Sequence, residues 1–292
     1  MESQSWFQNQ RVFRTLQVPD AVMEVSSALC RTRIIAVASG KGGVGKTWLS
    51  ISLAQALASS GYKVLILDGD FGLANVDIQL GLVPTHDVVD VLSGDVTIKD
   101  GVQHFCGGTG DAAYSFDVLA GRSGVSAVSG MNRDALDKLL LSLRLARQYD
   151  FILVDLCAGI DPITRHLAAI ADQLLAVTTD EPTALADVYA IMKLYLRDRR
   201  RVGGDDMHCQ LVINQASSHR SGVQTYEKLL QACRFFLKWE PQLAGTVRKD
   251  SRVSAAIRMQ SSLLENFPAS PAAVDVGRLV RQVVHGSLPA VA

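Results

Sequence analysis

The segment Gly40-Lys41-Gly42-Gly43-Val44-Gly45-Lys46-Thr47 could bind a chain of phosphates. It has the pattern of a phosphate-binding loop, in which Gly, four residues of any type, Gly and Lys precede Ser or Thr. Glycines allow backbone N–H groups to approach an anion, because no Cβ atom is in the way. Lys46 would then reach the β- and γ-phosphates, and the Thr47 hydroxyl would bind Mg²⁺. The alternative is a chance glycine-rich turn, which the complete motif disfavours.

The residues on either side of this loop fit the same interpretation. Residues 34–38 form an apolar, β-branched run, as expected of a buried parallel strand. Residues 48–57, which begin at Trp48, carry apolar residues at helical spacing, and Gly61 is a stop signal. The start of a helix adds unpaired N–H donors and a positive dipole end beside the anion.

Three carboxylates and one amide follow other predicted strands. Residues 62–70 form a strand that ends in Asp68 and Asp70, and residues 151–155 form one that ends in Asp155. The carboxyl ends of strands lie on the ligand side of an open α/β sheet. Asp155 therefore suits a magnesium shell. Asn214 ends the predicted strand 210–214, and its amide can both donate to and accept from the edge of adenine.

The remaining segments indicate one α/β architecture. Further strands are predicted at 117–119, 173–179 and 241–247, and helices at 132–147, 184–196 and 225–237, with a short helix and turn at 87–99 and a loop at 107–110. This alternation predicts a single doubly wound, mostly parallel β-sheet flanked by helices. We divide the chain into an N-terminal extension (1–33), a nucleotide-binding domain (34–270) and a C-terminal amphipathic helix with a short tail (271–292).

Composition limits the classes of partner. Lys plus Arg and Asp plus Glu number 29 each in 292 residues, so the net charge of zero argues against a generally basic nucleic-acid coat. The five cysteines form no C-x-x-C pair, which leaves a zinc or iron–sulfur site without support and favours reduced thiols in a cytoplasmic protein. Neither a secretory signal nor an apolar run of ~18 residues is visible.

The loop with its early lysine, Lys41, resembles the deviant phosphate loop of the MinD/ParA ATPase superfamily. Residues 71–82 and 178–190 resemble its flagellar-number branch, FlhG/FleN. The resemblance implies a Mg²⁺-dependent ATPase that dimerises on ATP and hydrolyses it slowly, with stimulation by a partner. Lys41 would reach the nucleotide of the second subunit, whereas the alternative for Lys41 is a solvated loop lysine.

The resemblance also gives roles to residues. Lys41, Lys46 and Asp70 would be catalytic, with Asp70 holding the attacking water. Thr47, Asp68 and Asp155 would surround the Mg²⁺ ion, and Asn214 would bind the base. We expect ATP to contact Gly40, Lys41, Gly42, Gly43, Val44, Gly45, Lys46, Thr47, Trp48, Asn214 and Arg248.

The chain departs from the family pattern at three places. Cys157 and Arg248 stand where family members carry prolines. Cys157 would loosen the segment after Asp155, which is the second switch segment of the family, and Arg248 would change the contacts beside the base. Residues 1–33 lack the Asp-Gln-Ala-x-x-Leu-Arg motif by which the flagellar branch stimulates its GTPase. By resemblance, the partners are a flagellar transcription activator and a flagellar GTPase. The extension is interpreted either as a partner-binding arm or as a helix folded back on the domain.

Other functions are also consistent with the sequence. One alternative is a ParA-like ATPase that positions cargo and binds DNA through a basic surface, for which residues 197–201 supply four arginines. Metal-cluster insertion is disfavoured by the unpaired cysteines, and a binding module without turnover by Asp70 and Asp155. The last helix has apolar residues at Val276, Leu279 and Val283. It would make a weak peripheral contact with the inner membrane or cell pole, or it would pack on the sheet.

Overall fold

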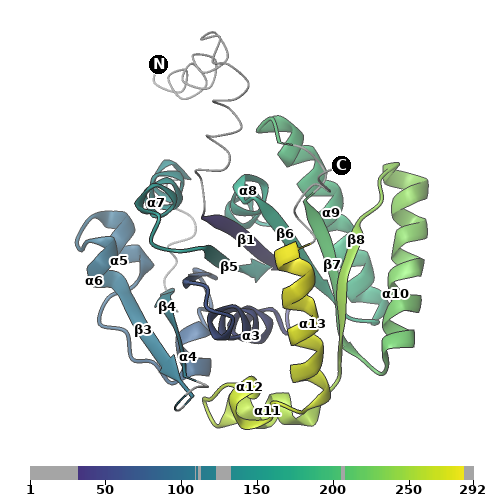
Figure 1. Cartoon of the computed structure of the whole chain (residues 1–292). Coiled ribbons are helices and arrows are strands. Elements are labelled where there is room, and N and C mark those ends of the chain that lie inside the picture. Colours follow the sequence, from purple (N-terminus) through teal and green to yellow (C-terminus); the bar gives the residue numbers. More distant parts are fainter. Residues whose placement is uncertain (1–31, 109, 111–112, 123–132, 205–207, 286–292) are drawn as a thin grey trace, which may run out of the picture.

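The computed structural model describes residues 32–108, 110, 113–122, 133–204 and 208–285. The predicted N-terminal extension, apart from its last two residues, and the tail after residue 285 lie outside this part of the chain. Figure 1 shows a central twisted sheet with helices on both faces.

The sheet has eight strands in the order β3-β4-β2-β5-β1-β6-β7-β8. All neighbouring strands run parallel except β3, which pairs antiparallel with β4 at one edge. The strands are β1 (Arg33–Ser39), β2 (Val64–Gly69), β3 (Val102–Gly107), β4 (Tyr114–Leu119), β5 (Phe151–Ala158), β6 (Gln173–Thr178), β7 (Cys209–Ala216) and β8 (Gln242–Arg248). The predicted doubly wound, mostly parallel sheet is confirmed.

Helices cover the two faces in two layers. One layer contains α3 (Lys46–Ser59), α4 (Val76–Leu80), α11 (Ser251–Arg258), α12 (Leu263–Asn266) and α13 (Pro271–His285). The other contains α5 (Val88–Ser93), α6 (Ile98–Gly101), α7 (Arg133–Ala146), α8 (Pro162–Ile170), α9 (Pro182–Arg201), α10 (His219–Ala232) and the π-helical turn η3 (Cys233–Leu237). Successive strand residues point to opposite faces, so Ile35 and Val37 join the first core while Ile34 and Ala36 join the second.

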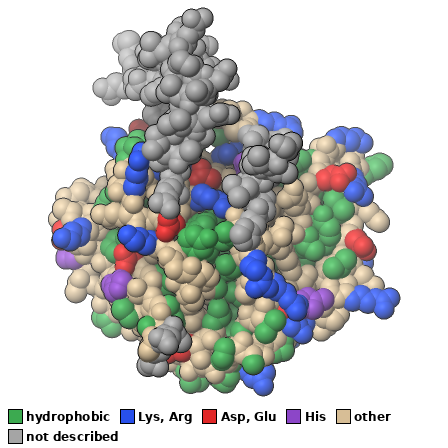
Figure 2. All heavy atoms as spheres, viewed as in Figure 1, with side chains coloured by type: hydrophobic (Ala, Val, Ile, Leu, Met, Phe, Trp, Pro, Cys, Tyr) green, Lys and Arg blue, Asp and Glu red, His purple; other side chains and the backbone are tan. Residues whose placement is uncertain are grey.

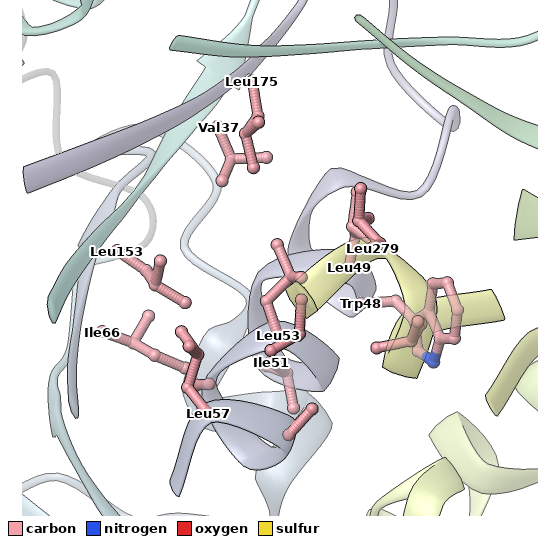
Figure 3. Packing of buried hydrophobic residues seen from close by; sticks show 14 of the residues in the cluster. Val37, Trp48, Leu49, Ile51, Leu53, Leu57, Ile66, Leu153, Leu175 and Leu279 are labelled. Atoms are coloured by element: carbon pink, nitrogen blue, oxygen red, sulfur yellow. The ribbon is translucent and has the colours of Figure 1, made fainter. Parts of the chain in front are cut away.

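Helix α3 is the centre of the first layer and positions the phosphate-binding loop. Its residues are buried on nearly every side, because it lies between the sheet and α13. In Figure 3, Leu57 faces Ile66 and Leu153 of the strands, whereas Leu49 and Trp48 lie beside Leu279 of α13. The start of α3 is therefore fixed from both sides.

Several predicted bounds differ from the structure. Residues 102–107 form β3, which was not predicted as a strand. Its last residue, Gly107, lies in the segment 107–110 that was predicted as a loop. At the edge of the sheet β3 is only half-buried, which leaves a weak sequence pattern. Strand β4 begins at Tyr114, before the predicted start. Helix α10 begins at His219 rather than near Thr225, because Ser218 caps it through a hydrogen bond from the Ser221 N–H group.

The last helix packs against the domain. The apolar stripe of α13, including Val276, Leu279 and Val283, is buried in the first core. Of the two interpretations of this helix, the structure therefore supports packing, and the stripe is not available to a membrane. No helix within the described residues is both long and apolar enough to span a bilayer.

A buried ion pair fixes α13 to the end of β8. The Asp275 carboxylate accepts hydrogen bonds from the Arg248 backbone N–H at 3.0 Å, from Nε at 2.8 Å and from Nη2 at 3.0 Å. The Asp275 side chain is fully buried, and His219 of α10 lies 3.1 Å from it. Arg248 thus links β8 to α13.

Charges on the surface are mixed. On the face drawn in Figure 2, basic side chains form several separate groups, the largest at the lower right, with acidic side chains between them. This distribution agrees with the zero net charge of the sequence.

The Asp275 cluster gives a prediction about stability. Asp275→Ala should lower the free energy of unfolding by about 2–4 kcal/mol, because Arg248 and the β8 backbone lose a buried acceptor. Chemical denaturation followed by circular dichroism measures this change. Asp95→Ala, on an exposed loop, is the control and should change the free energy by less than about 0.5 kcal/mol. Equal effects of the two substitutions would contradict the anchoring role of Asp275.

Candidate nucleotide-binding site

The loop between β1 and α3 presents unpaired N–H groups. Gly43 and Gly45 have φ values of 80° and 91°, which an L side chain adopts only with strain. Of the backbone N–H groups of residues 42–48, none donates a hydrogen bond to any residue that the structure describes. A row of free donors at the start of a helix is an anion-binding arrangement.

Lys46 lies at the base of this loop, at the first position of α3. Its side chain is nine-tenths buried, and among the described residues no hydrogen-bond acceptor contacts its ammonium group. Its charge is opposed by Asp155, whose carboxylate it stabilises. A largely buried lysine whose ammonium group lacks a hydrogen-bond acceptor can bind a further anion.

Thr47, Ser50 and Asp155 form a second polar cluster under the loop. Ser50 Oγ donates to Asp155 Oδ1 at 2.9 Å, and the Thr47 hydroxyl is close enough to lower the pKa of this carboxyl group. Asp155 lies on β5 directly opposite Asp68 of β2. The parallel pairing of these strands therefore brings the two predicted magnesium-shell carboxylates together.

Asp68 also organises the backbone after β2. Its Oδ1 accepts from the Asp70 N–H group at 3.0 Å, and its Oδ2 accepts from the Asn75 and Val76 N–H groups at 3.1 and 3.2 Å. The carboxylate of Asp68 therefore holds the turn that carries Asp70. Asp155, whose pKa is raised by burial but lowered by Thr47 and Lys46, is the carboxylate nearer the phosphate loop.

Asp70 lies on that turn and is half-buried. Its Oδ1 accepts from the Leu73 N–H group at 3.0 Å. The charge of Asp70 raises the pKa values of both Asp155 and Cys157, although it is a minor cause for each. Asp70 is thus close to the carboxylate cluster and to the β5–α8 turn.

Cys157 is a partly buried thiol. Its Sγ donates to Asp161 Oδ2 at 3.0 Å and lies 2.6 Å from the Thr164 Oγ1 atom. Burial, followed by the hydrogen bond to Asp161, raises the pKa of this thiol to about 12. The thiol is protonated at neutral pH and holds the β5–α8 turn where the family carries a proline.

Burial raises the pKa of both central carboxyl groups. The pKa of Asp68 rises to about 7, chiefly through burial and then through the charge of Asp155. The pKa of Asp155 rises to about 6 through burial, although Thr47, Lys46 and Ser50 oppose the increase. Two buried carboxylates that repel each other are stabilised by a divalent cation.

The residues present fit ATP and Mg²⁺. The loop offers N–H donors and a lysine to the phosphates, and Thr47 and Asp155 offer oxygen ligands. No group of three or more His, Cys, Asp or Glu in the described residues could hold a metal ion alone. Mg²⁺ is usually bound by one or two carboxylates together with substrate phosphates, so this limited ligand set is appropriate.

Lys41 contacts the start of α9 in the same chain. Its Nζ lies 2.5 Å from Glu181 Oε2 and 3.1 Å from Thr183 Oγ1. The side chains of Lys41 and Glu181 are 40% and 61% exposed. An ion pair this open to solvent contributes little to stability, so Lys41 can leave Glu181 for another anion.

Three further residues were predicted to contact ATP, namely Asn214, Arg248 and Trp48. Asn214 is buried and donates from Nδ2 to the Val44 carbonyl of the loop at 2.7 Å. The Arg248 guanidinium is bound to Asp275, and the Trp48 side chain is buried in the core. Trp48 can therefore contact a nucleotide only through its backbone. The base-binding roles of Asn214 and Arg248 stay predictions.

Comparison with known proteins agrees with this geometry. A family model described as an AAA domain matches residues 32–199. The antiactivator FleN of Pseudomonas aeruginosa is 32% identical over 268 residues, covering 92% of each chain. The flagellum site-determining protein YlxH of Helicobacter pylori is 29% identical and covers 81% of this chain and 76% of its own.

The chain belongs to the MinD/ParA family of ATPases. A solved structure of the septum site-determining protein MinD of Pyrococcus horikoshii, complexed with Mg-ADP, has a TM-score of 0.69 and 24% identity. It covers 86% of this chain and 96% of its own. This likeness supports the MinD/ParA fold. Similarity to FleN and YlxH agrees with the predicted flagellar-number branch.

Some residues of this MinD/ParA site were not predicted. Ser50 is three residues after Thr47, so helical spacing could have placed it near Asp155. Glu181, which binds Lys41, lies at the start of α9, and Gln215, whose Nε2 donates to the Gly43 carbonyl at 3.0 Å, lies at the end of β7. Both are distant from the loop in sequence. No spacing rule indicates such contacts.

The carboxylate pair gives a pH prediction. The folded-state pKa values of Asp68 and Asp155 lie above the ordinary value of an aspartate, about 3.9. Folding therefore retains protons that the unfolded chain loses, and the free energy of unfolding should fall as pH rises from about 4 to about 7. Asp155→Asn, which removes one charge, should raise the melting temperature of the nucleotide-free protein at pH 8 by about 2–4 °C, and by less at pH 5.

Thermal denaturation at the two pH values, without Mg²⁺, measures this effect. The exposed substitution Asp95→Asn is the control. An Asp155→Asn protein that is equally destabilised at both pH values would show that no charge repulsion is relieved.

Proposed function

We propose that this chain is a Mg²⁺-dependent ATPase switch that dimerises on ATP and controls the number or placement of flagella. The observation that carries the ATPase proposal is a loop whose N–H groups donate to no described residue, beside a largely buried Lys46 without a hydrogen-bond acceptor in the same part of the chain, and next to Thr47 and Asp155. Similarity to an antiactivator and to a flagellum site-determining protein supports the biological role.

The residues of the chain divide the work of hydrolysis. The loop N–H groups and Lys46 would hold the phosphates and oppose their charge. Asp70, close to Asp155 and fixed by the Leu73 N–H group, would orient a water molecule in line with the γ-phosphate. Bound Mg²⁺ would neutralise charge that develops on the phosphates. Positioning and charge neutralisation account for most catalysis of this kind.

Dimerisation depends on Lys41 in this proposal. In the single chain its ammonium is held by Glu181 and Thr183, at the surface. A triphosphate in a second subunit carries more negative charge than one carboxylate, so Lys41 would exchange Glu181 for that phosphate. ATP would then join two subunits, and hydrolysis would release them, as a switch requires.

The partners follow from the same resemblance. A flagellar transcription activator would bind one nucleotide state of the switch, and a flagellar GTPase or another partner would stimulate its slow turnover. The protein would act in the cytoplasm, or its partners would bring it to the inner membrane or the cell pole.

Lys46 tests nucleotide binding. Lys46→Ala should weaken Mg-ATP binding by on the order of 100-fold, because a buried charged donor to the phosphates is lost. Isothermal titration calorimetry measures the affinity, and the exposed Lys63 supplies the matched control, Lys63→Ala. Wild-type affinity in the Lys46 variant would refute the assignment of the loop.

Lys41 tests the switch. Asp70→Ala should slow hydrolysis and accumulate an ATP-bound dimer, and adding Lys41→Ala should keep ATP binding but return the protein to a monomer. Light scattering after gel filtration with and without ATP distinguishes these states. An ATP-dependent dimer in the double variant would remove Lys41 from the interface.

A further inference from the structure

The carbonyl groups of the phosphate loop accept hydrogen bonds from the protein. A peptide that turns its N–H group toward an anion turns its carbonyl the opposite way, and that carbonyl needs a donor. In this chain four loop carbonyls have one: Lys41 from Ser39 Oγ at 2.7 Å, Gly43 from Gln215 Nε2 at 3.0 Å, Val44 from Asn214 Nδ2 at 2.7 Å and Gly45 from the Leu49 N–H group at 3.0 Å.

Two of these donors are adjacent side chains at the end of β7. Asn214 is buried and Gln215 is exposed, and both reach back to consecutive carbonyls of the loop. The pairing of β7 with β8 is irregular between Ile213 and Ala216, so this pair interrupts the regular ladder. The Asn214 Oδ1 atom accepts from the Gln215 N–H group at 2.9 Å, which ties the two residues together.

The backbone of Gln215 is strained at this point. Its φ is 55°, in the left-handed region that favours Gly or Asn. A glutamine in this conformation carries a steric cost that a glycine would avoid, and a glycine would have no side-chain amide to donate. The hydrogen bond to Gly43 is that contribution.

The contact between loop and strand is also close. A Cβ atom at Gly45 would come within 2.5 Å of Asn214 Nδ2. The amide pair therefore contacts the loop on the side away from the free N–H groups, and the loop cannot shift toward β7.

We propose that Gln215 is a positioning residue for nucleotide binding. Together with Asn214 it holds the carbonyls of Gly43 and Val44 outward, so that the N–H groups already face the phosphates before the nucleotide arrives. A site that is ordered in advance loses less entropy on binding. This role rests on the proposed nucleotide site and adds to it a residue outside the loop motif.

Two substitutions distinguish the effect of the Gln215 side-chain amide from the effect of its left-handed backbone conformation. Gln215→Glu keeps the side-chain length but replaces the donor with a charged acceptor, whereas Gln215→Gly removes the side chain and relieves the left-handed strain. Gln260 offers a matched control, Gln260→Gly, because it has φ 48° and donates from Nε2 to the Ile78 carbonyl at 2.9 Å, away from the phosphate loop.

Three measurements test the role. Calorimetry with Mg-ADP gives the affinity without dimerisation, amide order parameters of residues 42–47 from NMR relaxation report the order of the free loop, and the melting temperature reports the fold. Gln215→Gly should weaken Mg-ADP binding about two- to tenfold, the loss of one hydrogen bond, and Gln215→Glu should weaken it more. The order parameters of the loop should fall in both variants, while the melting temperature of the Gly variant does not fall.

The outcomes are distinct. Wild-type affinity and unchanged loop order parameters in Gln215→Gly, or equal losses in Gln260→Gly, would overturn the positioning role while the nucleotide site stands. Absence of Mg-ADP binding by the unmodified protein would overturn the proposed function and this role together.

Discussion

The site depends on one electrostatic constraint: a largely buried lysine and two buried carboxylates lie together beneath a loop whose N–H groups donate to no described residue. Lys46 opposes the charge of Asp155, but it has no hydrogen-bond acceptor among the described residues. Asp68 and Asp155 repel each other across neighbouring strands. A polyanion above Lys46 and a cation between the carboxylates would satisfy both groups at once.

The architecture follows from this constraint. Parallel strands bring their carboxyl ends to one edge, so β1, β2 and β5 deliver the loop, Asp68 and Asp155 to the same place. Helix α3 is buried between the sheet and α13, which keeps its N-terminus fixed behind the loop. The Arg248–Asp275 pair anchors α13 in turn. The rigid elements therefore hold the charged groups in position without a bound ligand.

The charged residues of the site differ in their freedom to move. Lys41 is the member of the site that is both exposed and held by a surface carboxylate, Glu181. Lys46, Asp68 and Asp155 are buried and have little freedom to move. A lysine at the surface can change partners on binding, whereas a buried one cannot. The division between fixed and movable charges fits a protein that responds to the nucleotide state.

The sequence by itself determined the fold class, the phosphate loop and the carboxylates at the strand ends. Each of these is a local pattern: apolar runs of strand length, glycines at fixed spacing, and an aspartate directly after a strand. Edge strand β3 escaped prediction because its half-buried residues give no strong alternation. The start of α10 was missed because its capping residue precedes the apolar periodicity.

The tertiary structure alone decided the contacts between distant segments. Gln215 lies 172 residues from Gly43, and Glu181 lies 140 residues from Lys41. Similarly, only packing showed that the apolar stripe of α13 is buried and that Arg248 is paired with Asp275. A sequence pattern records which face of an element is apolar, but it does not record which element covers that face. That choice depends on how the whole sheet and its two layers assemble.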